Sequence, residues 1–385
     1  MQSFSVIEYF VPDYMHAVLF GISRSLLNFG ETFYLGEPAT VRLVDCRMKA
    51  IKPPSKLGRF SRGVSERKLW KAQEYHSWFL YYPPPVLCGI LPEPFLDHLA
   101  LLLSSARILL LSIPSCTEVF RRRYQLLNAF VCRVEALYGV GAMTFNMHLL
   151  LHLASCVRHL GPLWAHSAFV FEGGNGTLVN LVSAAKGLPQ QVVERVVMAQ
   201  ELELLLASHH LPNRVERICH GFLGYMPIQN ASQVEETTML GCGRAASITA
   251  DEKMALEQHC RASISSVTEY ERCVVKHQIY HSTAYTRATK SDTTFVCTND
   301  SSYFRISKIL ELKTSNGTCC ILLCRSVVLR QSQYLPEHIK ECFLSEVETV
   351  SCIEPANLKS SCVYIDFFTD SKSFICDLPN TIERD

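Results

Sequence analysis

The spacing of apolar residues predicts that the first half of the chain is helical. Apolar side chains recur at helical spacing in five segments, at residues 99–111, 117–137, 143–159, 164–185 and 190–207. Glycine and proline lie between these segments, at Gly139, Gly141, Gly161-Pro162 and Gly187-Leu188-Pro189. Both residue types are typical of the places where helices end and begin. We therefore expect at least five helices before residue 210.

Beyond about residue 270 the pattern changes to short β-branched or aromatic runs. They lie at residues 293–297, 303–312, 319–329, 362–368 and 373–376. Asn316-Gly317 predicts a hairpin turn between two of the runs. These features indicate a small antiparallel barrel or sandwich; the pattern does not choose between the two.

The sequence thus predicts an α+β chain in three parts. Residues 1–210 form a mainly helical part, and residues 266–385 form a β-rich C-terminal domain. Residues 211–265 read as a linker with one short helix at 251–263, because Gly, Ser, Thr and Asn accumulate there and the periodicity weakens.

Composition limits the kinds of partner. A net charge of +1 creates no global field toward nucleic acid, so DNA binding would need a local basic patch. The residues after Met1 do not resemble a signal peptide. The longest apolar stretch, 99–113, contains Arg107 and is shorter than the roughly 20 residues that span a bilayer, so no membrane partner is expected. The 17 cysteines are scattered, odd in number and without a C-x-x-C pair, which favours buried free thiols over a disulfide framework.

Two residue pairs have the spacing of metal ligands. His148 and His152 are four apart on a predicted helix, and Asp13 and His16 are three apart. Together they would make a tetrahedral N/O site for a structural Zn²⁺ that clamps two distant helices. Each pair also has a simpler interpretation: the histidines as hydrogen-bonded core residues, and Asp13 as a helix N-cap.

Glu172 lies among apolar and aromatic residues, in Phe169-Val170-Phe171-Glu172-Gly173-Gly174. A carboxylate is costly to bury unless it binds a cation, and sets of carboxylates hold the two metal ions of phosphodiester cleavage. Alternatively, Glu172 lies on an exposed turn and pairs with a nearby Lys or Arg.

Six short blocks in a fixed order give the chain a family resemblance. They are Asp13-Tyr14-Met15-His16; Trp70 to Glu74 with Trp78-Phe79-Leu80-Tyr81; Leu137-Tyr138-Gly139; Thr144 to His148 with Leu151-His152-Leu153; Gly161 to Trp164 with Ser167-Ala168-Phe169; and Phe171-Glu172 with Asn175-Gly176. From residue 13 to about 200 the chain resembles CACTA-type DNA transposases of the DDE superfamily and, more distantly, the V(D)J recombinase core.

The resemblance implies the C-terminal half of an RNase H-like catalytic core with its helical insertion. It gives Glu172 the third acidic position of the Asp-Asp-Glu triad, and Asp13 and His16 the Asp/Cys-x-x-His element. The two catalytic aspartates are not found: the twelve residues before Asp13 contain no Asp, and Glu8 is their only acid.

Basic residues concentrate between Arg42 and Lys71, opposed only by Asp45 and Glu66. Pro53-Pro54, Gly58 and Gly63 suggest an extended backbone that could follow phosphates. The expected DNA contacts are Arg59, Arg62, Arg67, Lys68 and Lys71; the alternative is a solvated surface loop. The run Arg121-Arg122-Arg123 is expected to be a solvated helix face.

These features predict a nuclear, transposase-derived protein. The intact parent enzyme would cut and join DNA with Mg²⁺, and this chain would be an incomplete, inactive fragment. Expected partners are double-stranded DNA, as transposon ends, and further copies of the chain in a homo-oligomer. The alternatives are a domesticated, non-enzymatic nuclear remnant that binds DNA or protein, and a helical scaffold unrelated to transposition. The role of the β-rich domain stays open.

Overall fold

The structure, a computed structural model, describes most of the chain. The described residues are 11–33, 36–59, 62–111, 117–223, 230–330, 335–345, 350–367 and 372–380. The fold is α+β, as predicted, with helices in the N-terminal part and antiparallel sheets in the C-terminal part. No described helix is long and apolar enough to cross a membrane.

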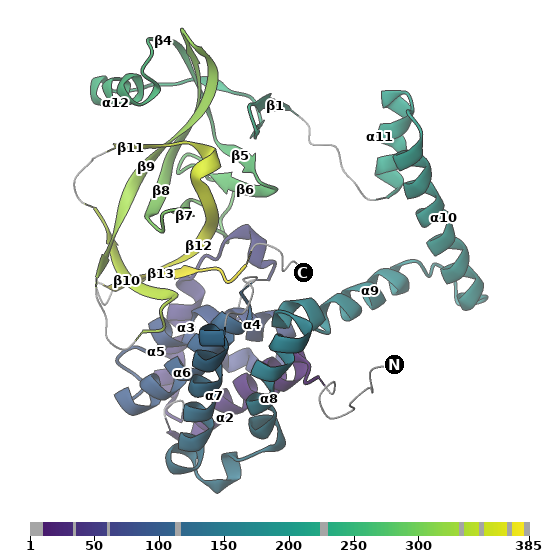
Figure 1. The fold of residues 1–385 in the computed structure, drawn as a ribbon, viewed down its shortest axis with the longest axis vertical. Helices are drawn as coiled ribbons and strands as arrows, with labels where there is room; N and C mark the ends of the chain where they lie inside the picture. Colours follow the sequence, from purple (N-terminus) through teal and green to yellow (C-terminus); the bar gives the residue numbers. More distant parts are fainter. Residues whose placement is uncertain are drawn as a thin grey trace.

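The helical body is built from residues 14 to 166 (Figure 1). Its elements are η1 (Tyr14–Ser23), α2 (Arg24–Phe33), α3 (Pro38–Ala50), η2 (Ser55–Leu57), η3 (Val64–Leu69), α4 (Ala72–Tyr81), α5 (Pro83–Leu87), α6 (Glu93–Leu109), α7 (Thr117–Tyr138), η4 (Val140–Ala142), α8 (Phe145–Leu160) and η5 (Leu163–His166). No described strand precedes Ala231, so the sheet of an RNase H-like core is not among the described residues and that expectation stays a prediction.

Three further helices leave this body as an arm (Figure 1): α9 (Phe169–Asn180), α10 (Leu188–Ser208) and α11 (Asn213–Phe222). Glycines that the sequence predicts at helix ends lie at the borders of these helices and earlier in the chain. Gly139, Gly161 and Gly187 have φ values of 82°, 89° and 69°, the left-handed region that glycine adopts without a steric penalty. Gly161 ends α8, and Gly187 precedes α10.

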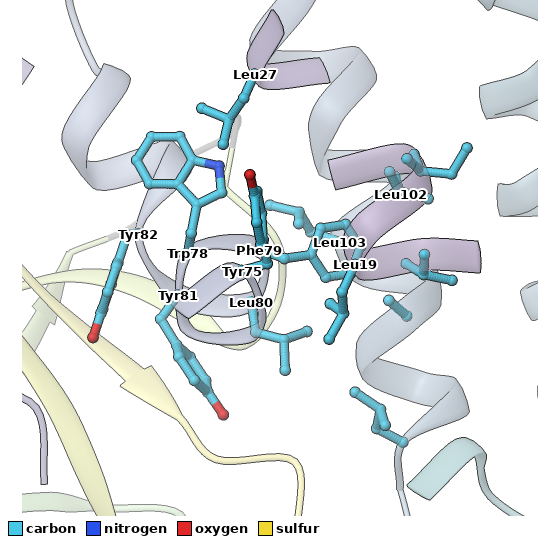
Figure 2. Packing of buried hydrophobic residues seen from close by; sticks show 14 of the residues in the cluster. Leu19, Leu27, Tyr75, Trp78, Phe79, Leu80, Tyr81, Tyr82, Leu102 and Leu103 are labelled. Carbon is cyan, nitrogen blue, oxygen red and sulfur yellow. The ribbon is translucent and has the colours of Figure 1, made fainter. Parts of the chain in front are cut away.

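Helix α4 lies at the centre of the helical core. Nine of its ten residues are buried, and Figure 2 shows its aromatic side chains between residues of η1, α2 and α6. Leu19 and Leu27 pack from the N-terminal helices, and Leu102 and Leu103 pack from α6. η1 is also buried on most of its surface, which is why its sequence is apolar nearly all round.

The C-terminal part contains thirteen strands and two short helices among the described residues. They are β1 (Ala231–Val234), β2 (Thr237–Leu240), β3 (Arg244–Ala245), α12 (Ala250–Cys260), β4 (Ile264–Tyr270), β5 (Arg272–Val275), β6 (Gln278–His281), β7 (Phe295–Thr298), β8 (Tyr303–Thr314), β9 (Gly317–Arg330), β10 (Ile339–Leu344), β11 (Val350–Ile353), η6 (Pro355–Asn357), β12 (Leu358–Phe367) and β13 (Lys372–Asp377).

Six of these strands close into a barrel, in the order β7-β8-β9-β10-β13-β12 and back to β7. Every pairing is antiparallel, so one of the two architectures left open by the sequence, the barrel, is confirmed. The predicted hairpin turn joins β8 to β9, where Thr314 pairs with Gly317. A separate four-stranded sheet has the order β1-β2-β5-β6. Leu256 of α12 packs on Leu310 and Leu323 of the β8–β9 ribbon.

The division into three parts stays a prediction, but the segment predicted as a linker is folded. The predicted linker contains α11, strands β1 to β3 and α12, and residue 266 falls inside β4. Only the short helix, predicted at 251–263, is found close to its expected place. These strands are only two to four residues long, and β2 and β3 pair with the more distant strands β5 and β4, so local periodicity gave no sign of them.

The barrel and the helical body share one hydrophobic core. Phe367, Phe374 and Leu378 belong to the same buried cluster as Phe79 and Leu102. Polar contacts fix the junction: His338 Nε2 lies 2.9 Å from the carbonyl oxygen of Leu80, and the backbone N–H of Asp292 donates to Pro53 at 3.1 Å. The cysteines that the structure describes are free thiols.

Candidate functional site

Asp13 joins the start of η1 to the start of α9. Its Oδ2 accepts the backbone N–H of His16 at 2.8 Å, so the predicted N-cap role is confirmed. Its Oδ1 accepts the backbone N–H of Ala168 at 2.7 Å, although the two residues are 155 positions apart. Ala168 is the N-cap residue of α9 and has no side-chain cap of its own. One carboxylate therefore satisfies backbone donors of two helices.

His16 lies between two carboxylates. Its Nδ1 is 2.6 Å from Oδ2 of Asp13, and its Nε2 is 3.9 Å from Oε1 of Glu172. The first contact fixes the ring, because Asp13 is itself held by its backbone hydrogen bonds. The structure thus brings together three of the residues that the sequence singles out: Asp13, His16 and Glu172.

Glu172 lies in the first turn of α9, where the helix dipole favours a negative charge. Its side chain is 59% exposed, so the aromatic residues around it in sequence do not bury it. Within the described part of the chain its ionisable neighbour is His16, and no Lys or Arg pairs with it. The predicted exposed position is therefore correct, and the predicted basic partner is replaced by a histidine.

Packing beneath this junction comes from α4. The ring of His76 meets Tyr14 edge-on at a centroid distance of 6.3 Å and Phe169 at 6.4 Å. His76 is almost fully buried, so it fills the space between η1 and the start of α9. Edge-to-face contacts of this kind fix ring orientation. The geometry of Asp13, His16 and Glu172 thus rests on a packed aromatic cluster.

His166 is a residue of this region that the sequence did not single out. It lies on η5, just before α9, and burial lowers the pKa of its imidazole, while the nearby Asp13 acts in the opposite direction. Its place in the block Gly161 to Phe169 was the only available sign.

His148 and His152 form a second, separate pair on α8. Their Nε2 atoms are 3.1 Å apart, and both side chains are exposed. The shared helix face is as predicted, but the interpretation as core histidines is wrong. η1 and α8 meet instead at Gly21, where an added Cβ would lie 2.6 Å from Nδ2 of Asn146.

The two pairs do not assemble into the predicted zinc site. In the described part of the chain, no group of three or more His, Cys, Asp or Glu side chains is placed to hold a metal ion. Asp13 also has both oxygens engaged, one with Ala168 and one with His16. The structural zinc site of Asp13, His16, His148 and His152 therefore finds no support in the described residues and stays a prediction.

The basic segment is less extended than predicted, because it contains α3 and the short helices η2 and η3. Arg62, one of the predicted DNA contacts, is engaged by groups of the fold itself. Its Nε and Nη2 donate to the carboxylate oxygens of Glu74 at 2.7 and 2.6 Å, and Nη2 also donates to the carbonyl of Leu69. Glu74 is only 2% exposed. This bidentate pair fastens the loop to α4 and serves the fold.

Electrostatics at this pair follow from the same contacts. Burial acts to raise the pKa of Glu74, but hydrogen bonds from Arg62 and from the Lys71 backbone N–H more than offset it, and the pKa is lowered overall. The hydrogen bond to Glu74 raises the pKa of Arg62. Glu74 is therefore an ion that caps α4 and holds the loop at neutral pH.

The other basic residues divide into structural and exposed groups. Arg47 donates to the carbonyls of Val86 and Cys88, and Arg67 donates to Val64. The exposed group, which includes three of the five predicted DNA contacts, comprises Arg42, Lys49, Lys52, Arg59, Lys68 and Lys71. Arg121 and Arg122 are exposed on α7, as expected for a solvated face.

Comparison with known proteins gives no independent assignment of this site: no protein-family model, no curated protein and no solved structure matches the chain.

Proposed function

We propose that the chain is a transposase-derived nuclear protein that corresponds to the C-terminal half of a DDE catalytic region. The intact parent enzyme would cleave and rejoin DNA with Mg²⁺, and Glu172 would be the third acidic ligand of that site. The observation that carries this proposal is the contact among Asp13, His16 and Glu172. These residues come from two sequence blocks more than 150 positions apart, and the resemblance assigns both blocks to the catalytic core.

The chain as it stands would not cleave DNA. Two-metal catalysis needs several carboxylates to hold both ions. Asp13 is engaged in capping η1 and α9, and Glu172 is the remaining carboxylate at the junction. The proposed activity of this chain is therefore DNA binding without chemistry.

The proposed DNA-binding surface is formed by Arg59, Lys68 and Lys71. All three are exposed: Arg59 precedes η3, Lys68 lies in its last turn, and Lys71 follows it. The bidentate pair of Arg62 and Glu74 holds the backbone that carries them, so these cations would be presented on a fixed loop. Each neutralised phosphate would release counterions and make binding depend on salt.

The test is a titration of a fluorescent duplex with the full chain at several salt concentrations. We expect the Arg59→Gln, Lys68→Gln, Lys71→Gln variant to bind all sequences more weakly, with a salt slope flatter by roughly 0.9 for each lost phosphate contact. The matched control changes three exposed cations at the far end of the β-rich part: Lys253→Gln, Arg261→Gln and Lys313→Gln (Figure 1).

The control variant should bind like the wild type. Equal loss in both variants would mean that net charge, and not this loop, attracts DNA. If the wild-type chain does not bind duplex DNA at low salt, the proposed DNA-binding function is wrong.

The alternative is a domesticated remnant that acts through protein contacts. The shared core of the helical body and the barrel favours it, because the two parts form one body that could act without catalysis. Free thiols agree with a reducing compartment such as the nucleus. A chain that fails to bind DNA, yet is located in nuclei and retains its fold, would favour this alternative.

A further inference from the structure

The arm formed by α9, α10 and α11 lacks the packing that its apolar sequence predicts. α10 is 21 residues long and apolar on most of its surface, and helices of that kind are normally buried. Yet neither α9 nor α10 contains a buried residue. Figure 1 shows α10 and α11 standing away from both the helical body and the barrel. Most of the stability of protein helices comes from the packing of an apolar face, so the arm is expected to have a packing partner.

α11 presents a regular apolar stripe. Val215, Ile218 and Phe222 recur at i, i+3 and i+7, which places them on one face. All three are exposed, and Phe222 is 80% exposed. On α10, Met198 and Leu204 are 67% and 68% exposed. An apolar stripe that is exposed to solvent, such as the one on α11, marks an interaction site.

The charges on the two helices are opposite. α10 carries Glu194, Glu201 and Glu203 against one base, Arg195. Arg195 turns back to the α9–α10 loop, where its Nη2 donates to Ser183 Oγ at 2.7 Å, so the outward charge of α10 is acidic. α11 carries Arg214 and Arg217 against Glu216, and neither arginine has an ion-pair partner within the described part of the chain.

We propose that the arm is a homodimer interface in which α10 of one copy packs against α11 of the other. A two-fold axis makes this arrangement self-complementary, because each copy offers one acidic helix and one basic helix. At 1.5 Å per residue, α10 and α11 give about 31 and about 15 Å of helix. A contact stripe about 10 Å wide along both helices, with α9 added, approaches the roughly 800 Å² per partner of a standard interface.

A charge exchange tests the proposal with the full chain. In copy one, Arg214→Glu and Arg217→Glu make both helices acidic; in copy two, Glu201→Arg and Glu203→Arg make both basic. Each alone should sediment as a monomer at about 20 μM, with a dimer dissociation constant raised at least about tenfold. Mixed together, the two should form a heterodimer, because each acidic helix then meets a basic one.

The apolar contribution is tested by Val215→Ser, Ile218→Ser and Phe222→Ser together, which should also give a monomer. The change should leave the fold intact, because these side chains are already exposed. The matched control, Leu43→Ser, Met254→Ser and Ile279→Ser, removes exposed apolar groups outside the arm and should leave the dimer unchanged.

A wild-type chain that stays monomeric at this concentration overturns the proposal, even if the arm then captures a different protein. A dimer that survives both arm variants, or a mixture of the exchanged copies that stays monomeric, overturns it as well. None of these readouts involves DNA, so the result is independent of the DNA-binding proposal.

Discussion

The side chain of Asp13 accepts the backbone N–H of Ala168 at 2.7 Å and, through its other oxygen, the backbone N–H of His16 at 2.8 Å. A single short side chain therefore fixes the helix that carries His16 against the helix that carries Glu172. Any role of Glu172 depends on this contact for its position.

Removing that contact should destabilise the fold. We expect Asp13→Ala to lower the free energy of unfolding by about 1–3 kcal/mol, because a cap is lost and backbone donors of two helices are left without their acceptor. Asp13→Asn should cost less, since the amide oxygen can still cap one helix. Urea unfolding followed by circular dichroism measures both. Glu172→Gln is the control and should lie within about 0.5 kcal/mol of the wild type, because its side chain is exposed.

Within the basic segment, substitutions in the pair of Arg62 and Glu74 should lower the stability of the fold the most. Arg62→Ala leaves a carboxylate that is 2% exposed without its partner, and breaking a buried pair in this way typically costs about 3–5 kcal/mol. Arg62→Lys should recover only part of this, because an ammonium cannot make the bidentate contact. Arg59→Ala should leave stability unchanged and weaken DNA binding.

The pH dependence of the same pair has a defined sign. The pKa of Glu74 is lowered in the folded state. Its contribution to the free energy of unfolding is therefore present above the unfolded pKa and is lost as pH falls through the folded pKa. Measured from pH 7 downward, the free energy of unfolding of Arg62→Ala should fall less steeply with pH than that of the wild type. Equal slopes in the two proteins would contradict the assigned role.

His338 should make the junction between barrel and helical body sensitive to mild acid. It is fully buried, and burial lowers its pKa from 6.5 to about 4. The unfolded chain therefore binds the proton more readily, so stability is full above pH 6.5 and falls as pH approaches 4. A pKa difference of that size corresponds to roughly 3 kcal/mol in the free energy of unfolding.

The measurement is the free energy of unfolding against pH for the wild type and His338→Gln. Glutamine can still donate to the carbonyl of Leu80 but does not titrate, so its curve should be flatter between pH 6.5 and 4. His16→Gln serves as the control at an exposed histidine. If the His338→Gln curve parallels the wild type, the buried imidazole does not limit acid stability.

Sequence reasoning found the features whose cause is local. Asn316-Gly317 marks the β8–β9 hairpin, and Gly161 ends α8, because backbone conformation decides both. It missed β10, where Lys340 and Glu341 interrupt the apolar run. There the strand is fixed by distant partners: Lys340 pairs with Asp377, and Glu341 with Phe374 in the register of β13.

In the candidate site, too, features with a local cause were predicted and features fixed by distant partners were missed. The shared face of His148 and His152 follows from helix periodicity and is found. The role of Arg62 is set by Glu74, a buried residue twelve positions away on another helix, and no count of charges reveals it. The contact of His16 with both Asp13 and Glu172 was not predicted. The resemblance gave these residues separate roles in the catalytic core, and spacing alone could not relate residues so far apart in the chain.

The last prediction concerns catalysis. The full chain should not nick supercoiled DNA in Mg²⁺ or Mn²⁺, because Asp13 is held by Ala168 and His16, and two metal ions need more than the single carboxylate of Glu172. Conversion of supercoiled to open-circular plasmid measures this, with Glu172→Gln as the matched control for contaminating nuclease. Equal, low conversion in both proteins is the expected result. Metal-dependent nicking that Glu172→Gln abolishes would show that other carboxylates complete the site, and Glu8 would be the first to substitute.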